Sequence, residues 1–240
     1  RLNSFTVQMY EEIRTALAAI KSEANVRVLV ITGAGRAFSA GQDLADRAVT
    51  PGDEAIDLGA SVETYYAPLI RTLTALPFPV IAAVNGVAAG AGASVALAAD
   101  IVIAAKRAKF IMSFANIGLV PDSGASWVLP RAIGQSRALG MALTGEPVSA
   151  QSAADWALIW KCADDDCFLS EVDALVHKLA AAPTLGLAAT KRLIRSAFTQ
   201  NLTDQLDRER DDMRRLGQSQ DYREGVDAFI NKRTPTFVGR

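Results

Sequence analysis

The sequence contains only two cysteines, Cys162 and Cys167, and a single histidine, His177. The two cysteines enclose the acidic stretch CADDDC, and one pair of this kind supplies neither a disulfide framework nor a four-ligand zinc site. We therefore expect ordinary thiols in an acidic loop and no metal ion.

The chain also lacks an excess of charge of either sign, since 25 basic residues stand against 26 acidic ones. A net charge of −1 gives no positive surface for nucleic acid or for an anionic membrane. The first residues, RLNSFTVQMYEEI, do not follow the basic-then-apolar layout of a signal peptide. These features predict a soluble cytoplasmic protein whose partners include neither nucleic acid nor membrane.

A long uncharged run, residues 72–99, has the length of a membrane span. Pro77, Pro79, Gly86 and Gly90 interrupt this run, so a buried strand, a turn and a helix explain it better. Apolar spacing predicts the same alternation elsewhere, with Ser4 or Thr6 as the cap of the first helix. Helices are expected over residues 4–23, 62–76 and 91–100, and strands over 26–33, 77–86 and 100–112.

These elements, in a chain of 240 residues of which half are apolar, predict an α/β layered core with a small appended subdomain. The strand over 26–33 is expected to be buried on both faces. Residues 45–59 are polar and acidic and are expected to form a lid-like loop. After about residue 183 the chain becomes helical and highly charged, and its apolar stripe must dock on the core or on a neighbouring subunit. The stripe comprises Leu202, Leu206, Met213 and Leu216.

Two segments rich in small residues follow predicted strands: ITGAGRAFSAGQDL, residues 31–44, and AVNGVAAGAGASVALAAD, residues 83–100. Small side chains let a ligand approach the backbone, and the start of the second segment's helix presents unpaired N–H groups. No G-x-G-x-x-G fingerprint opens a helix, which excludes a dinucleotide-binding reading. Tight turns and close packing of a helix on a strand remain the alternative explanation.

Two such segments together favour a pair of convergent N–H donors, which is an oxyanion hole. A third stretch, NIGLVPDSGASW, places one carboxylate, Asp122, among apolar and small residues. An acid is rarely found in such surroundings without a partner or a role. Asp122 is therefore a candidate acid–base group, which Ser123 or Ser126 holds in place unless they cap a helix.

Three stretches resemble a known family: RAFSAGQDL, VIAAVNGVAAGAGASVALAADIVIAA and GLVPDSGASWVLPRAIGQSRALGMALTGEPVSAQSAADWALI. The chain is similar to the crotonase (enoyl-CoA hydratase/isomerase) superfamily over nearly its whole length. Within that family, VPDSGAS, YREGVDAF and KRTPTFVG look most like the members that isomerise ring-1,2-epoxyphenylacetyl-CoA in phenylacetate degradation.

The resemblance implies an α/β fold with a crotonase-like ββα spiral core over residues 1–183. It also implies a C-terminal helical trimerisation subdomain over residues 184–240, and hence a homotrimer or a hexamer built as a dimer of trimers. The family begins with a strand hairpin upstream of LNSF. The sequence begins at RLNSF, so these residues either were removed or are not included in it. If the protein truly lacks them, an edge of the core sheet and part of the coenzyme A cleft would be missing.

The resemblance further implies an acyl-CoA thioester as substrate, with coenzyme A as part of that substrate and no separate cofactor. Matching the motifs places the two N–H donors for the thioester oxygen on Ala40 and Ala91. Asp43 is expected chiefly to brace its turn, and Lys232 and Phe237 to reach the coenzyme A. The substrate-binding residues are expected to be Ala37, Ser39, Gly41, Asp43, Leu44, Gly90, Ser94, Phe114, Leu119, Lys232 and Phe237.

The acids depart from the pattern of the family's hydratases, which use two glutamates. The matching positions hold Ser94 and Phe114, so simple hydration is disfavoured. Asp122 matches a third position, where some isomerases and the 4-chlorobenzoyl-CoA dehalogenase keep an aspartate. The dehalogenase also uses a histidine and a tryptophan, whereas His177 lies in a late helix and the tryptophan position is Phe114. Dehalogenation is therefore disfavoured as well.

One carboxylate that removes a proton at one carbon and returns it at another fits isomerisation. Apolar neighbours, Phe114, Leu119 and Val120, are expected to disfavour the charged form of Asp122 and make it a stronger base. The predicted reactions are the conversion of ring-1,2-epoxyphenylacetyl-CoA to oxepin-CoA and the Δ3-to-Δ2 shift of an enoyl-CoA double bond. The alternatives are an enoyl-CoA hydratase of broad specificity and a non-catalytic protein that binds coenzyme A or acts as a scaffold.

Overall fold

The computed structural model describes residues 2–23, 25–43 and 57–240. The chain divides into two compact units. The first comprises Arg1–Ala24, Val30–Thr74 and Val80–Val172, and the second comprises Asn25–Leu29, Ala75–Pro79 and Asp173–Arg240. The division falls inside helix α7 (Phe168–Ala180), earlier than the boundary expected at residue 183, and two short segments from the N-terminal half belong to the second unit.

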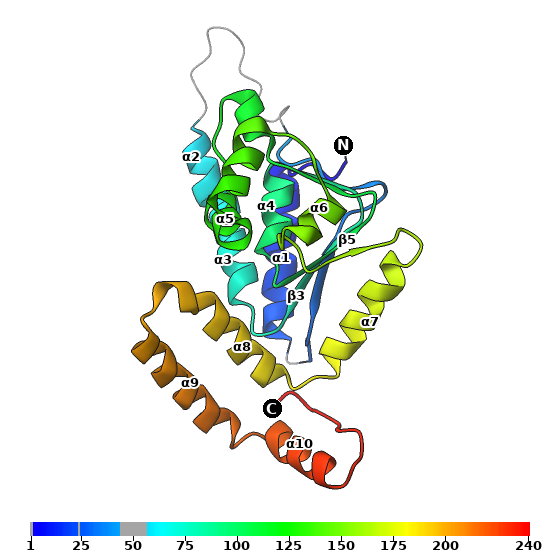
Figure 1. Cartoon of the computed structure of the whole chain (residues 1–240), viewed down its shortest axis with the longest axis vertical. Helices are drawn as coiled ribbons and strands as arrows, with labels where there is room; N and C mark the ends of the chain where they lie inside the picture. The colour runs from blue at the N-terminus through cyan, green and yellow to red at the C-terminus, as the bar shows by residue number, and fades with distance from the viewer. Residues whose placement is uncertain (1, 24, 44–56) are drawn as a thin grey trace. The chain divides into compact units, whose positions relative to one another are not determined.

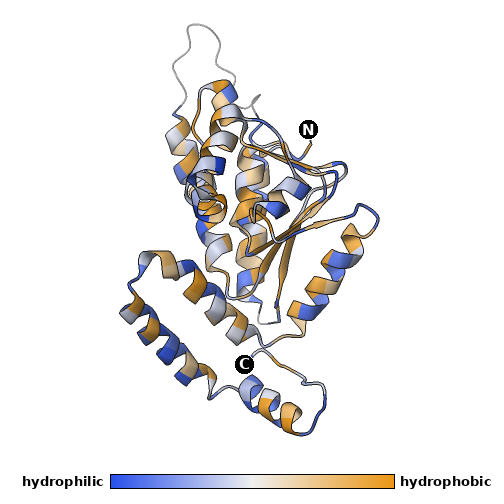
Figure 2. Ribbon diagram, viewed as in Figure 1, coloured by the Kyte–Doolittle hydropathy of each residue, from blue (hydrophilic) through white to orange (hydrophobic). Residues whose placement is uncertain are grey.

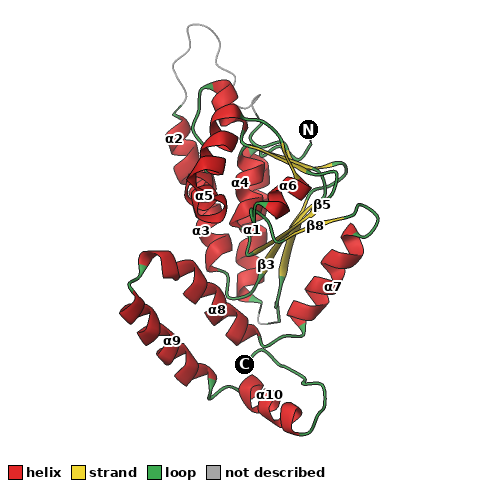
Figure 3. Ribbon diagram, viewed as in Figure 1, coloured by secondary structure: helices red, strands yellow, loops and turns green. Residues whose placement is uncertain are grey.

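The first unit is built on two four-stranded sheets (Figure 3). One sheet has the order β1-β3-β5-β8 and the other has the order β2-β4-β6-β7. The first sheet consists of β1 (Leu29–Thr32), β3 (Val80–Val84), β5 (Ile101–Ala105) and β8 (Lys161–Ala163). The second consists of β2 (Ala37–Ser39), β4 (Val87–Ala89), β6 (Lys109–Ile111) and β7 (Val148–Ser149).

Strands β1 to β6 alternate between the two sheets, and a helical segment follows each of the three consecutive pairs β1–β2, β3–β4 and β5–β6. Strands β3 and β5 pair in parallel with Ile81 opposite Ile101, and β4 and β6 pair in parallel with Ala88 opposite Phe110. Strand β7 runs antiparallel to β6. Each ββα turn therefore adds one strand to each sheet, and the expected α/β spiral core is confirmed. The helices that follow the strand pairs are α3 (Ala67–Ala75), α4 (Ala91–Ala98) and α5 (Ala125–Thr144), as Figure 1 shows.

The core is apolar where the sequence predicted it. All five residues of β3 are buried, as are all eight residues of α4. In Figure 2 these central strands are coloured as hydrophobic. The strand expected over 26–33 is shorter and is not buried on both faces: Thr32 is exposed and the other β1 residues are half-buried. The reason is topological, because β1 is the edge strand of its sheet.

The predicted helix over residues 4–23 is α1 (Val7–Ser22), and its cap is Thr6, whose side-chain oxygen accepts a hydrogen bond from the N–H of Met9. The helix predicted over 62–76 has a different start. A short helix, α2 (Leu58–Ser61), leads into one wide turn, η2 (Val62–Tyr66), in which the backbone is a π-helix, and α3 follows. Most of the lid loop predicted over residues 45–59, namely residues 45–56, lies outside the described residues.

The second unit confirms the predicted helical, highly charged C-terminal region. It contains α8 (Thr184–Ser196), α9 (Leu202–Leu216) and α10 (Gln220–Ile230). The last residues of the chain are held by two buried or half-buried charges. The Asp221 carboxylate accepts hydrogen bonds from the N–H groups of Val238 and Gly239, and Arg27 donates to the carbonyl oxygens of Ala182 and Phe237.

Two further elements of the first unit are a 3-10 helix, η3 (Ser113–Ile117), and α6 (Ala150–Asp155). A 3-10 turn, η4 (Ala197–Thr199), ends α8 in the second unit. Among the helices of the described chain, none is both long enough and apolar enough to cross a membrane.

Candidate functional site

The two segments rich in small residues meet in the first unit. Strand β2 pairs with β4, with Ser39 opposite Ala88, and the chain after β2 continues alongside the start of α4. A Cβ atom at Gly41 would lie 2.8 Å from the carbonyl oxygen of Ala89 and 3.4 Å from the backbone nitrogen of Ala91. Gly41 also has φ of +90°. Only glycine allows this approach, which brings residues 40–42 against the first N–H of α4.

Close packing of helix on strand, the alternative to a binding site, is present as well. A Cβ atom at Gly92 would lie 2.7 Å from the Cβ of Ser39, so α4 rests directly on β2. The Ser39 hydroxyl donates to the carbonyl oxygen of Asn3 at 2.8 Å and accepts from the N–H of Gly41 at 3.1 Å. Ser39 therefore holds the turn through its side chain, and Ala37 is buried in β2.

The predicted donor Ala91 is the first residue of α4. Its N–H has no acceptor within its own helix, because the bonding pattern of an α-helix leaves the first N–H groups unpaired. The preceding residue, Gly90, has φ of +51° and donates its own N–H to the carbonyl oxygen of Ile111 at 2.8 Å. The positive end of the helix dipole adds to the attraction of a negative oxygen at this point.

The other predicted donor, Ala40, does not fit its role in this structure. Its N–H donates to the carbonyl oxygen of Leu2 at 3.0 Å and is therefore already engaged by the N-terminal residues. The neighbouring residues also bond to the N-terminal segment. The N–H of Phe5 donates to the carbonyl oxygen of Gly41 at 2.8 Å, and the N–H of Asp43 donates to the carbonyl oxygen of Phe5 at 2.9 Å.

The bridge between Phe5 and Gln42 uses the carbonyl oxygen of Gly41 and the N–H of Asp43, so the N–H of Gln42, which lies between them, is directed away from Phe5. Sequence reasoning missed Gln42. The sequence carries no direct signal for this donor, because the direction of the Gln42 N–H follows from the pairing of Phe5 with Gln42, which the sequence does not display.

The carboxylate of Asp122 lies in the turn between η3 and α5 and is half-buried. It accepts a hydrogen bond from the hydroxyl of Ser123 at 2.9 Å, as one of the two expected roles of Ser123 requires. The turn is set by two successive left-handed residues, Ser123 with φ of +52° and Gly124 with φ of +82°. The cap of α5 is Gly124, and no side chain caps this helix. The Asp122 carboxylate is therefore not used as a helix cap.

The apolar surroundings predicted for Asp122 are only partly present. Phe114 is buried, and its ring lies 3.9 Å from the position of a Cβ on Gly90, which places an apolar wall beside the start of α4. Val120, in contrast, is 78% exposed and Leu119 is 39% exposed in the single chain. The expectation that Leu119 and Val120 shield the acid is wrong for this chain alone, because the segment before Pro121 runs along the surface.

Ser94 occupies a position where a hydratase of the family would carry a glutamate. Its side chain is buried, and its hydroxyl donates to the carbonyl oxygen of Gly90, one turn earlier in α4, at 3.3 Å. Phe114 occupies the other position. Asp43 is half-buried, and its backbone N–H donates to the carbonyl oxygen of Phe5. The bracing role of its side chain stays a prediction.

The remaining predicted contacts belong to the second unit or lie outside the described residues. Leu44 lies outside the described residues. Lys232 and Phe237 belong to the second unit, where Lys232 is exposed and Phe237 packs on Gly225. Their contact with coenzyme A stays a prediction.

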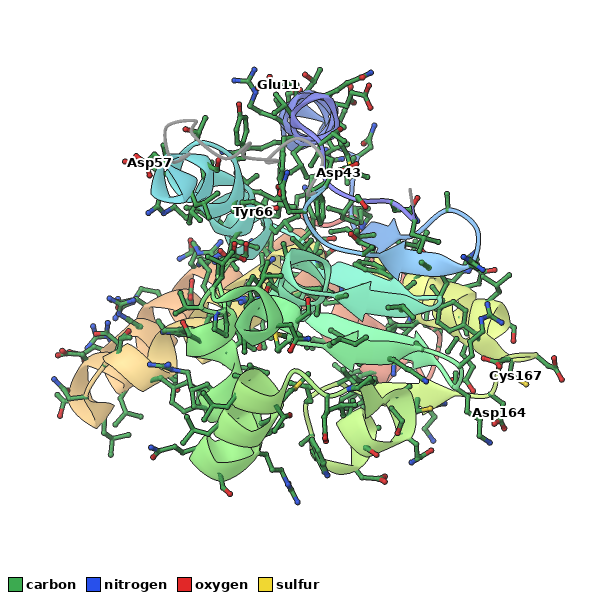
Figure 4. The ribbon with its side chains drawn as sticks, turned by 90° about the horizontal axis from the view of Figure 1, so that it is seen from above. Glu11, Asp43, Asp57, Tyr66, Asp164 and Cys167 are labelled. Carbon is green, nitrogen blue, oxygen red and sulfur yellow. The ribbon has the colours of Figure 1, made fainter. Side chains whose placement is uncertain are left out.

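Cys162 and Cys167 are both free, as expected of ordinary thiols. Burial raises the pKa of the Cys162 thiol, so this group is less reactive than an exposed cysteine. The neighbouring loop is held by an exposed ion pair of Lys106 with Asp164 at 2.8 Å, and this hydrogen bond lowers the pKa of Asp164. In Figure 4, Asp164 and Cys167 lie well apart from Asp43 and Tyr66. The cysteine loop is therefore not part of the candidate site.

The sequence and fold of this chain are matched by known proteins. The chain matches the Enoyl-CoA hydratase/isomerase family over residues 1–240. It is 52% identical to the 1,2-epoxyphenylacetyl-CoA isomerase of Escherichia coli K12, covering 100% of this chain and 92% of that protein. It is 35% identical to the 2,3-dehydroadipyl-CoA hydratase of the same strain, covering 99% of this chain and 89% of that protein.

A solved structure of an enoyl-CoA hydratase from Bacillus anthracis superposes with a TM-score of 0.92 at 32% identity, covering 100% of this chain and 92% of that one. The chain therefore belongs to the enoyl-CoA hydratase/isomerase family and has the crotonase fold. It is an enzyme of that family, and the resemblance of its sequence to the epoxyphenylacetyl-CoA isomerase is confirmed.

Proposed function

We propose that this protein is an acyl-CoA isomerase that moves a proton with Asp122 while two backbone N–H groups hold the thioester oxygen. The observation that carries the proposal is the close approach of Gly41 to the start of α4, where an added Cβ would lie 3.4 Å from the backbone nitrogen of Ala91. The 52% identity to an epoxyphenylacetyl-CoA isomerase supports the isomerase activity.

The proposed donors are the N–H of Ala91 and the N–H of Gln42, in place of that of Ala40, which Leu2 engages. Removal of a proton next to a thioester carbonyl places negative charge on the carbonyl oxygen. One preorganised donor lowers the barrier of such a step by about 3 kcal/mol. Both donors belong to the backbone, so the positions of Gly41 and Gly90 decide where the oxygen sits.

Asp122 removes the proton at one carbon of the acyl group and returns it at another. No atom is gained or lost, which is the balance of an isomerisation. The proposed substrates are ring-1,2-epoxyphenylacetyl-CoA, which opens to oxepin-CoA, and a Δ3-enoyl-CoA, which becomes the Δ2 isomer. Coenzyme A is part of both substrates, and the proposal includes no separate cofactor. The pathway would be phenylacetate catabolism.

A hydratase of broad specificity is the second candidate, because the relative with 35% identity is a hydratase. Ser94 and Phe114 argue against it, since neither side chain can act as a carboxylate base. A non-catalytic protein that binds coenzyme A is the third candidate, and it would need no acid at position 122.

The proposal includes a cytoplasmic homotrimer or hexamer. Its support is the apolar stripe of α9, where Leu202 is 73% exposed and Met213 is 71% exposed in the single chain. Such a stripe is typically covered in an assembly.

The proposal is tested with three substrates measured side by side: ring-1,2-epoxyphenylacetyl-CoA, a Δ3-enoyl-CoA and crotonyl-CoA. We expect turnover of at least one of the first two and little loss of the conjugated absorbance of crotonyl-CoA. Fast hydration of crotonyl-CoA alone would favour the hydratase. Binding without turnover of any of the three would favour the non-catalytic protein.

A further inference from the structure

Four aromatic side chains form a cluster next to the Gln42 segment: Phe5, Tyr10, Tyr65 and Tyr66. Phe5 stacks on Tyr10 with ring centroids 5.3 Å apart, and Tyr10 stacks on Tyr65 at 5.2 Å. Tyr66 meets Phe5 and Tyr10 edge-on, at 6.2 and 4.9 Å. The ring of Tyr66 is fully buried, so its position is fixed on several sides.

The hydroxyl of Tyr66 donates a hydrogen bond to the side-chain oxygen of Gln42 at 2.5 Å. The side-chain nitrogen of Gln42 donates to the carbonyl oxygen of Asp43 at 3.3 Å. Figure 4 shows Tyr66 near Asp43 in the part of the molecule that carries α1 and α2. The Gln42 side chain is therefore held at both of its polar atoms.

The backbone on either side of Gln42 is held by Phe5, another member of the cluster. The N–H of Phe5 donates to Gly41, and the carbonyl oxygen of Phe5 accepts from Asp43. The aromatic cluster thus holds Gln42 twice, through the backbone at Phe5 and through the side chain at Tyr66. These contacts set the direction of the Gln42 N–H.

Tyr66 stands at the end of the π-helical turn η2, residues Val62–Tyr66. Such turns are rare, and they occur frequently at functional sites, because the extra residue shifts the side chains that follow. Here the turn aims the hydroxyl of Tyr66 at Gln42, whereas Tyr65, one residue earlier, stacks on Tyr10.

We infer that Tyr66 is a positioning residue: its hydroxyl fixes the Gln42 side chain and thereby the Gln42 N–H that polarises the thioester carbonyl. This inference rests on the proposed function for the role of Gln42. A small misplacement of a preorganised donor reduces rate much more than binding, because the donor stabilises negative charge that develops in the transition state.

The test uses Tyr66→Phe with Tyr65→Phe as its matched control. Both variants lose one phenolic hydroxyl from the same turn, and among the described residues the Tyr65 hydroxyl makes no hydrogen bond. The first readout is the infrared carbonyl stretch of bound butyryl-CoA, a saturated thioester that cannot isomerise. We expect wild type and Tyr65→Phe to shift this stretch to lower frequency, and Tyr66→Phe to lose a substantial part of the shift.

The second readout is the rate of isomerisation. We expect Tyr66→Phe to lower kcat about tenfold and to leave KM nearly unchanged. In a Gln42→Ala background, which keeps the backbone N–H but removes the bonded amide, Tyr66→Phe should have no further effect. Additive effects of the two substitutions would overturn the inference.

The carbonyl measurement separates this inference from the proposed function. If the wild type shifts the carbonyl but isomerises no substrate, the proposed function fails and the comparison of variants still decides the role of Tyr66. If Tyr66→Phe keeps the full shift, the inference is overturned and the isomerase proposal stands. If the wild type shows no shift, no oxyanion hole exists and the inference is also overturned.

Discussion

The hydroxyl of Ser123 donates a hydrogen bond to the carboxylate of Asp122 at 2.9 Å, and Ser123 itself adopts a left-handed backbone conformation with φ of +52°. The bond lies within the turn that precedes α5, and Ser123 is buried. A single residue therefore orients the proposed acid–base group with both its side chain and its strained backbone. Mutation can separate the contribution of the Ser123 hydroxyl from that of the left-handed backbone.

Ser123→Ala and Ser123→Gly both remove the hydroxyl, so both should lower isomerisation by about tenfold or more, because a hydrogen bond to a charged group contributes about 1.5–3 kcal/mol. Glycine also relieves the left-handed strain, which costs alanine about 1–2 kcal/mol. We expect Ser123→Gly to unfold at higher urea concentration than Ser123→Ala, with equal loss of rate. Equal stabilities would show that the backbone at this position is not strained.

Gly41→Ala should abolish most of the activity and destabilise the first unit. The new methyl group would lie 2.8 Å from the carbonyl oxygen of Ala89 and would push residues 40–42 away from α4. Gly35→Ala is the control, since Gly35 also has positive φ, +71°, but nothing lies within 4 Å of an added Cβ. Both variants carry backbone strain of about 1 kcal/mol. A rate loss as large in Gly35→Ala would assign the effect to strain and not to the site.

Asp221→Asn should loosen the C-terminal residues. The carboxylate of Asp221 is buried and accepts the N–H groups of Val238 and Gly239 at 2.7 and 2.9 Å. The amide of asparagine offers one oxygen and turns a donor toward the second N–H, at a cost of about 1–3 kcal/mol. Hydrogen exchange of residues 236–240 should quicken. Asp173→Asn, at an exposed position, is the control and should leave the exchange unchanged.

The tail is also expected to respond to acid. Arg233 and the N–H of Thr236 donate to Glu224 and lower its pKa from 4.5 to about 2. Because the folded pKa lies below the ordinary value, this pairing stabilises the folded chain above pH 4.5, and the contribution is lost as the pH falls toward 2. The Tm difference between wild type and Glu224→Gln should therefore shrink between pH 5 and 2. A constant difference would contradict the assignment.

The strand and helix pattern was predictable because it depends on local spacing. The buried strand β3 and the helix α4 follow from runs of apolar and small residues, and the cap at Thr6 follows from its position before α1. The edge position of β1 was not predictable, since it depends on the order of strands in the sheet. Neither was the tie of Arg27 to Phe237, because the sequence does not show which distant residues meet.

The segments that form the candidate site were predictable from the sequence, whereas the particular backbone N–H donors were less so. The two small-residue segments do meet, at Gly41 and Ala91. The choice of Ala40 was wrong for this structure, because the direction of an N–H depends on which neighbour the segment pairs with, here residues 2–5. The role of Tyr66 depends on a π-helical turn, which apolar spacing reads as ordinary helix.

The central claim is that Asp122 moves the proton, and exchange of the substrate's α-proton in deuterated water tests it most directly. We expect the wild type to exchange this proton in a bound acyl-CoA, and Asp122→Asn to do so at least about 100-fold more slowly with unchanged affinity. Asp166→Asn, at an exposed position in the cysteine loop, is the control and should exchange at the wild-type rate. Exchange at the wild-type rate in Asp122→Asn would contradict the account.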